Sequence, residues 1–145
     1  MRSLLESWQF WAVLSASFAA LTAIFAKVGV ESIHADAATF IRTIVILLLL
    51  AAILLASGEF PVIGDISRKT WIFLVLSGLA TGASWLCYFR ALKIGDAARV
   101  APIDKLSVVL VAVAGVVFLG EKLSAANWLG VALIAVGSIL VAMRL

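Results

Sequence analysis

Long runs of apolar residues dominate the chain, and only short polar segments separate them. A membrane-spanning helix needs about 20 consecutive, predominantly apolar residues, and five runs are close to that length. Because lipid offers the backbone no hydrogen-bond partner, each run must form a helix. The strands of a β-barrel would alternate polar and apolar residues, whereas Ile44 to Ile53 is apolar throughout. The pattern therefore predicts helices over residues 8–30, 37–57, 71–94, 97–119 and 124–143.

Glycines and polar residues mark the connections between these helices. The segment from Gly58 to Lys69 reads as the longest loop, and Gly95-Asp96 ends the third helix and can cap the fourth. Gly120 stops the fourth helix, and Ser124 is a candidate N-cap for the fifth. No connection is long enough to fold separately, so we expect one transmembrane domain over residues 1–145. Glu6 and the length of the first run favour a membrane helix over a cleaved signal peptide.

Composition supports the same class of protein. Hydrophobic residues make up 65% of the chain and charged residues 13%, against roughly 45–50% and 25% in soluble domains. The net charge of +3 comes from scattered single residues, so a nucleic-acid partner is not expected. Cys87 and His34 are the sole residues of their types, which excludes an internal disulfide and argues against a metal site. We expect the lipid bilayer as partner, no cofactor and no metal.

Catalytic chemistry is not indicated. The chain has no P-loop, no H-E-x-x-H and no G-x-S-x-G, and no pair of His and Cys residues suits a base and a nucleophile. The sequence therefore predicts a protein that is not an enzyme.

The distribution of Lys and Arg gives little orientation signal. One side of the membrane would carry four basic residues: Arg2, Arg68, Lys69 and Lys122. The other side would carry seven, and omitting the three that lie deepest in the apolar runs leaves four: Lys27, Lys93, Arg99 and Arg144. Flanking positive charge sets topology, so a balanced count leaves two interpretations open. Either slight effects select one orientation, or copies insert both ways.

Four charged residues lie inside the predicted helices, and such residues are costly enough to indicate function. Arg42 is near the start of the second helix, Arg90 is near the end of the third, and Asp104 and Lys105 are in the first part of the fourth. These helix ends face one side, so the four charges can share a vestibule on the substrate pathway, with Asp104 the leading candidate. Alternatively, the three cations snorkel to the headgroups.

Pro102 also supports two interpretations. If the fourth helix starts at Pro102, Asp104 occupies the third helical position, where the helix dipole favours an acid. Otherwise Pro102 breaks the helix and exposes the carbonyl of Ala98, and broken helices at membrane depth mark transporter binding sites.

Aromatic and small residues add candidate surfaces. Trp85, Tyr88 and Phe89 follow helical spacing beside Ser84, and they either pack or line a substrate cavity. Small residues four or seven apart let helix backbones approach closely, within one chain or across a dimer. The candidates for such packing are Gly78, Gly82, Gly130 and Gly137.

Two segments of the sequence resemble the EamA domain, the repeat unit of the drug/metabolite transporter superfamily. They are the stretch from Ala91 to Pro102 and the LGEKLS turn over residues 119–124, which is followed by a glycine-containing last helix. The resemblance covers essentially the whole chain and is closest to the short five-helix branch of bacteria and archaea. It implies transport across their cytoplasmic membrane. Larger members resemble two such units of opposite orientation, which implies here a homodimer, with an antiparallel arrangement as the expected one.

Two departures from the family pattern matter. Many members carry a proline further along the fourth helix, where this chain has Ser107-Val108. Small multidrug exporters carry a glutamate in the first helix, but no acid lies between Glu6 and Glu31 here, so proton-coupled drug export by that route is not supported. The sequence thus predicts a transporter of small solutes, with a non-transporting membrane subunit or assembly partner as the alternative.

Overall fold

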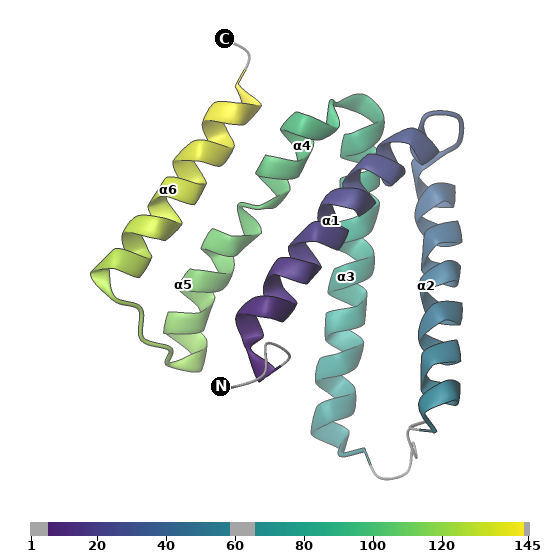
Figure 1. Cartoon of the computed structure of the whole chain (residues 1–145), viewed down its shortest axis with the longest axis horizontal. Coiled ribbons are helices and arrows are strands. Elements are labelled where there is room, and N and C mark those ends of the chain that lie inside the picture. Colours follow the sequence, from purple (N-terminus) through teal and green to yellow (C-terminus); the bar gives the residue numbers. More distant parts are fainter. Residues whose placement is uncertain (1–5, 59–65, 144–145) are drawn as a thin grey trace. The chain divides into compact units, whose positions relative to one another are not determined.

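Helices are the only regular secondary structure in the residues that the structure, a computed structural model, describes, which are 6–58 and 66–143. No strand occurs in those two segments. Five helical spans are long and apolar enough to cross a membrane, and the fourth consists of two helices in succession, as Figure 1 shows. The helices are α1 (Trp8–Val30), α2 (Ala35–Ser57), α3 (Arg68–Ile94), α4 (Ala97–Asp104), α5 (Ser107–Leu119) and α6 (Ala125–Ala142). The predicted all-α fold with five transmembrane helices is confirmed.

Two helices begin earlier than the sequence predicts. Helix α2 starts at Ala35, two residues before the predicted start, so Asp36 lies in its first turn. Helix α3 starts at Arg68 and takes Arg68 and Lys69 out of the predicted loop. The reason is a missed cap, because the Ser67 hydroxyl accepts a hydrogen bond from the Thr70 backbone N–H at 3.1 Å. Residues 59–65 of that loop, together with Arg2 and Arg144, lie outside the described residues.

The predicted stop and start signals of the last two spans are confirmed. Gly120 follows α5 with φ of 69°, in the left-handed region that glycine adopts without strain. The Ser124 side chain accepts a hydrogen bond from the Asn127 backbone N–H and caps α6. The intervening turn is held by the Glu121 N–H, which donates to the Gly115 carbonyl at 3.1 Å.

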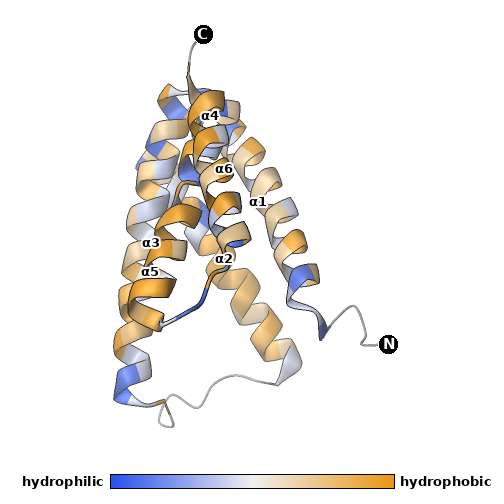
Figure 2. Ribbon diagram, turned by 90° about the vertical axis from the view of Figure 1, so that its left-hand side faces the viewer, coloured by the Kyte–Doolittle hydropathy of each residue, from blue (hydrophilic) through white to orange (hydrophobic). Residues whose placement is uncertain are grey.

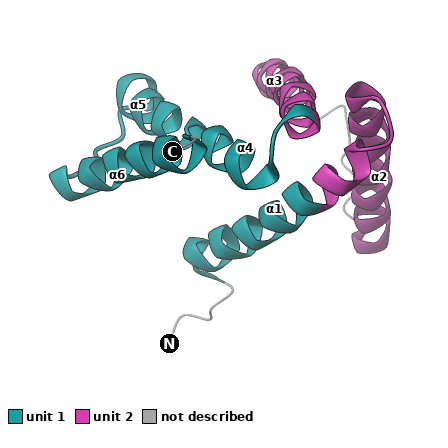
Figure 3. Ribbon diagram, turned by 90° about the horizontal axis from the view of Figure 1, so that it is seen from above, with its two compact units in different colours: residues 1–24, 94–145 teal, residues 25–93 magenta. Residues whose placement is uncertain are grey.

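The helices group into two compact units, coloured separately in Figure 3. Unit 1 contains residues 1–24 and 94–145, in which α4 and α5 both pack against α6. Unit 2 contains residues 25–93, with the end of α1, all of α2 and almost all of α3.

The buried residues of unit 2 gather at one end of its helices. Val30 at the end of α1 and Leu92 near the end of α3 are fully buried. Phe89, Ala35 and Ala38 are also buried. The remaining length of the helices is apolar and exposed, and hydrophobic residues predominate along α2, α5 and α6 in Figure 2. In a bilayer this exposed apolar surface faces lipid or another protein.

Candidate functional site

The fourth membrane span is broken, and Pro102 lies inside its first helix rather than at a helix start. Helix α4 begins at Ala97, so the interpretation in which the helix starts at Pro102 is wrong. Proline has no N–H, so the Ala98 carbonyl loses its usual partner four residues on. Beyond Pro102 the bonds tighten to three-residue spacing: Leu106 N–H donates to Ile103 O, and Val108 N–H to Lys105 O, both at 3.0 Å.

A charged pair occupies this break. The Lys105 Nζ lies 3.2 Å from the Asp104 Oδ2, because the helix ends between these two residues and their side chains can converge. Asp104 is the last residue of α4 rather than the third residue of a helix starting at Pro102, and it precedes the N-terminus of α5.

The break lies about a third of the way along the membrane span. Helix α4 has 8 residues in a span of 23. At about 1.5 Å per residue, the break lies about 12 Å along a span of about 35 Å. Backbone carbonyls and two charged side chains are thus placed together at a depth where lipid offers no hydrogen bonds.

Arg90 has a different environment, which the sequence did not reveal. Its Nε and one terminal amino group donate to the two Asp36 carboxylate oxygens at 2.9 and 2.8 Å, joining α3 to α2. Asp36 is the residue that sequence reasoning missed, because the second helix was predicted to begin after it. The available signal was an acid at the membrane side where Arg90 is expected, at a helix start where acids are favoured.

Lysines reinforce the same end of unit 2. The Lys27 Nζ donates to the Leu92 carbonyl at 2.9 Å, and the Lys93 Nζ donates to the Ile33 carbonyl. We call Lys27, Asp36, Arg90 and Lys93 the polar clasp. It ties the end of α1, the start of α2 and the end of α3 around the buried residues Val30 and Leu92.

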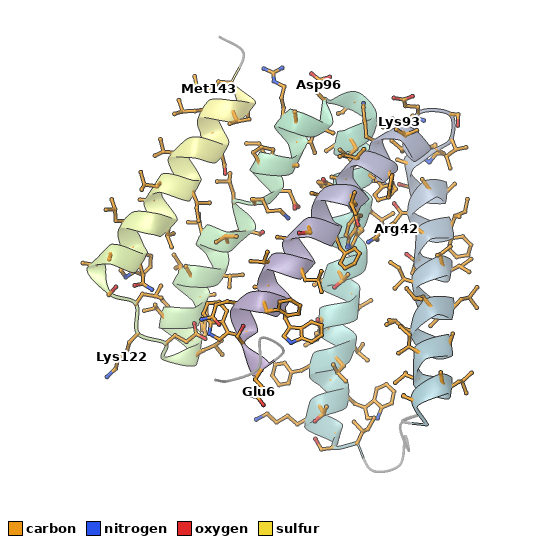
Figure 4. All side chains as sticks on the ribbon, in the orientation of Figure 1. Glu6, Arg42, Lys93, Asp96, Lys122 and Met143 are labelled. Carbon is orange, nitrogen blue, oxygen red and sulfur yellow. The ribbon has the colours of Figure 1, made fainter. Side chains whose placement is uncertain are left out.

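Arg42 lies further along α2 than the polar clasp, and Figure 4 shows its side chain extending from α2 toward α3. Its guanidinium carbon lies 3.4 Å from the ring centroid of Trp85. Trp85 also makes edge-to-face contacts with Tyr88 at 5.5 Å and Phe89 at 5.9 Å between ring centroids. The three aromatic residues of α3 therefore pack against one another, and the Arg42 guanidinium stacks on one of them, Trp85. Ser84, the other candidate here, is exposed.

Each of the four charged residues predicted to line the pathway thus contacts a near neighbour within its own unit. Asp104 and Lys105 pair in unit 1, while Arg90 pairs with Asp36 and Arg42 stacks on Trp85 in unit 2. The vestibule shared by all four stays a prediction. So does the packing role of Gly78, Gly82, Gly130 and Gly137; a Cβ added at any of them would meet no heavy atom within 4 Å in the described structure.

The comparison with protein families decides the identity of the fold. The model described as the EamA-like transporter family matches residues 6–143, which is nearly the whole chain. The chain belongs to the EamA-like transporter family. With its five spans, this EamA-like protein is an integral membrane protein, and its family is one of transporters.

Two bacterial relatives have transporter names without an assigned substrate. The EamA-like protein is 67% identical over 137 residues to an uncharacterized transporter in the cobO 3' region of Sinorhizobium sp., covering 94% of this chain and 97% of that protein. It is 28% identical over 145 residues to the uncharacterized transporter YxxF of Bacillus subtilis, covering 99% of this chain but 45% of that protein. No solved structure matches this EamA-like chain.

Proposed function

We propose that this protein moves small solutes across the cytoplasmic membrane of a bacterium, and that it does so as a homodimer. The observation that carries the transport proposal is the broken fourth span, with Asp104 and Lys105 about a third of the way along it. Discontinuous helices supply free backbone carbonyls and helix ends near the centre of the bilayer, where transporters hold their substrates and coupling ions. The family match supports transport, and the bacterial relatives support the location.

The chemistry of the break fits a site that exchanges partners. A carboxylate that pairs with an adjacent ammonium at 3.2 Å can release it to a competing cation or proton. The Lys105 ammonium, freed in this exchange, can then bind an anionic group of the solute. Asp104 is therefore the side chain whose loss should affect transport most directly.

Reconstitution of the purified chain into phosphatidylcholine vesicles tests transport. The assay measures uptake of a panel of radiolabelled neutral, cationic and anionic solutes against protein-free vesicles. Transport requires that at least one class enters faster with protein present, and the proposal is refuted if none does. That outcome would favour a membrane subunit or assembly partner.

Asp104→Asn then tests the site, with Asp96→Asn as the matched control. Asp96 is an exposed aspartate at the N-cap of α4, directly before the same span, and its side chain makes no cap hydrogen bond there, whereas Asp104 is half-buried. We expect Asp104→Asn to reduce uptake at least tenfold and Asp96→Asn to leave it unchanged. Equal uptake by both variants would remove Asp104 from the pathway.

Two observations support the homodimer. The Bacillus relative is more than twice as long as the stretch that this chain covers, so two copies of the chain supply a comparable amount of membrane helix. The small-residue face of α3 at Gly78 and Gly82 is also exposed, with open space above both glycines. The balanced count of Lys and Arg supports an antiparallel arrangement of the two copies.

A further inference from the structure

We propose that Arg42 binds an oxyanion of the transported solute, a carboxylate in the first instance, and that Trp85 holds the guanidinium ready for it. This inference rests on the proposed function, because it names the substrate class of the transporter. Arg42 and Trp85 both belong to unit 2, so the site is complete within one compact part of the chain.

Arg90 and Lys105 each have an acidic partner, and Arg42 differs from them. Arg90 is neutralised by Asp36 through two hydrogen bonds, and Lys105 is neutralised by Asp104. Arg42 makes no ion pair among the described residues of unit 2, and its contact there is the Trp85 ring. A lone cation inside a membrane span is expensive and faces a cavity, a partner or a ligand.

The stacking geometry leaves the binding edge of Arg42 free. A separation of 3.4 Å from the ring centroid is van der Waals contact, so the flat guanidinium lies face-down on the indole. Its five N–H groups point outward in the plane, where they match the two oxygens of a carboxylate. None of them donates a hydrogen bond in the described structure, and the half-buried side chain keeps part of its surface open.

The position of Arg42 within the membrane span favours contact with a solute over contact with the lipid headgroups. Arg42 lies seven residues after Ala35, about 10 Å along α2. Trp85 lies nine residues before Ile94, about 14 Å from the end of α3. The Asp36–Arg90 pair places these two helix ends on the same side. By stacking on the deeper residue, the guanidinium stays within the span instead of snorkelling outward.

The tryptophan also fixes the orientation of the fork. A free arginine side chain loses much rotamer freedom when it binds, and a guanidinium already stacked has lost part of it. Trp85 is braced by Tyr88 and Phe89, and Phe89 is buried. The aromatic group is therefore a rigid platform that presents Arg42 rather than a ligand in its own right.

Matched pairs of small molecules test the proposal on the full-length protein in dodecyl maltoside. Acetate, lactate and benzoate are compared with acetamide, lactamide and benzamide, and inorganic phosphate forms a further arm. The readout is the shift of the thermal unfolding midpoint with ligand concentration, which gives a dissociation constant without any flux measurement. We expect at least one carboxylate to stabilise the protein and its amide to have no effect. Phosphate binding in place of carboxylate would confirm the oxyanion site and reassign the solute class within it.

Variants identify the residue responsible. Arg42→Gln should weaken binding by about 10- to 100-fold, the range expected for losing a charge-assisted bidentate contact. Arg42→Lys keeps the charge without the fork and should fall between. Arg68→Gln removes the same charge from the exposed start of α3 and should bind as the unaltered protein does. Helical circular dichroism and elution volume verify folding of each variant.

Three results would overturn the inference: unaltered affinity in Arg42→Gln, equal binding of acids and amides, or no binding of carboxylate and phosphate. Repeating the titration in phosphatidylcholine vesicles separates the sources of the anion. Binding that persists there belongs to the solute, whereas binding lost there assigns Arg42 to lipid phosphate and refutes the proposal. Carboxylate binding without flux of any solute would instead refute transport alone, so the two failures are distinguishable.

Discussion

The face of α3 that contains Gly78 and Gly82 gives the sharpest test of the homodimer. In the described structure a Cβ added at either glycine meets no atom within 4 Å. The first side-chain carbon of a Gly78→Leu or Gly82→Leu substitution therefore meets no clash in the described structure. Replacing a mid-helix glycine instead favours the helix by about 0.5–1 kcal/mol. Thermal unfolding of a monomer should be unchanged or slightly raised.

A second copy packed on this face reverses the expectation. Leucine in place of glycine overpacks a close helix–helix contact and costs typically about 1–3 kcal/mol. Since about 1.4 kcal/mol is a factor of ten, the dissociation constant of the dimer should rise about 5- to 150-fold. A two-fold symmetric interface contains each substitution twice, which places the result toward the upper end.

The assay is energy transfer between fluorescently labelled copies in vesicles, titrated by dilution with lipid. Gly29→Leu is the matched control, because Gly29 is also an exposed helical glycine with open space above it, but lies on α1. We expect Gly78→Leu and Gly82→Leu to weaken association of the copies. Gly29→Leu should leave association unchanged. Unchanged association in all three variants would refute α3 as the interface, and loss of folded monomer would show that the chain itself packs there.

Three further predictions follow from single features. Gly120→Ala should lower the free energy of unfolding by about 1–2 kcal/mol, the cost of a left-handed residue with a Cβ, in a denaturant titration; no loss would mean that the turn after α5 rearranges. Asp36→Asn should lower the unfolding midpoint, and the exchanged pair Asp36→Arg with Arg90→Asp should recover part of it; equal loss in both would contradict an ion pair as the cause. Adding lysines to the connection between α2 and α3 should bias insertion toward one orientation, which reporters fused to the two termini measure. A single orientation in both the unaltered protein and the variant would contradict dual insertion.

The sequence by itself determined the class of the protein and most of its helix bounds. Apolar runs near the thickness of a bilayer leave the backbone one way to satisfy its hydrogen bonds, so five spans followed directly. Gly120 and Ser124 marked a helix end and a helix start because their conformational and capping preferences are local. The short segments from Ala91 to Pro102 and around LGEKLS sufficed to identify the family, which the match over residues 6–143 confirms.

Only the tertiary structure decided which partner each charge takes. Periodicity places Arg42 and Arg90 on helices but does not say that Asp36 neutralises one and Trp85 supports the other. Pro102 allowed either a helix start or a break; the helix begins at Ala97 and gives way only after Asp104, so the acid ends a helix and meets Lys105. Pairing across helices depends on register and side-chain direction between segments distant in sequence, which a local pattern of polar and apolar residues does not encode.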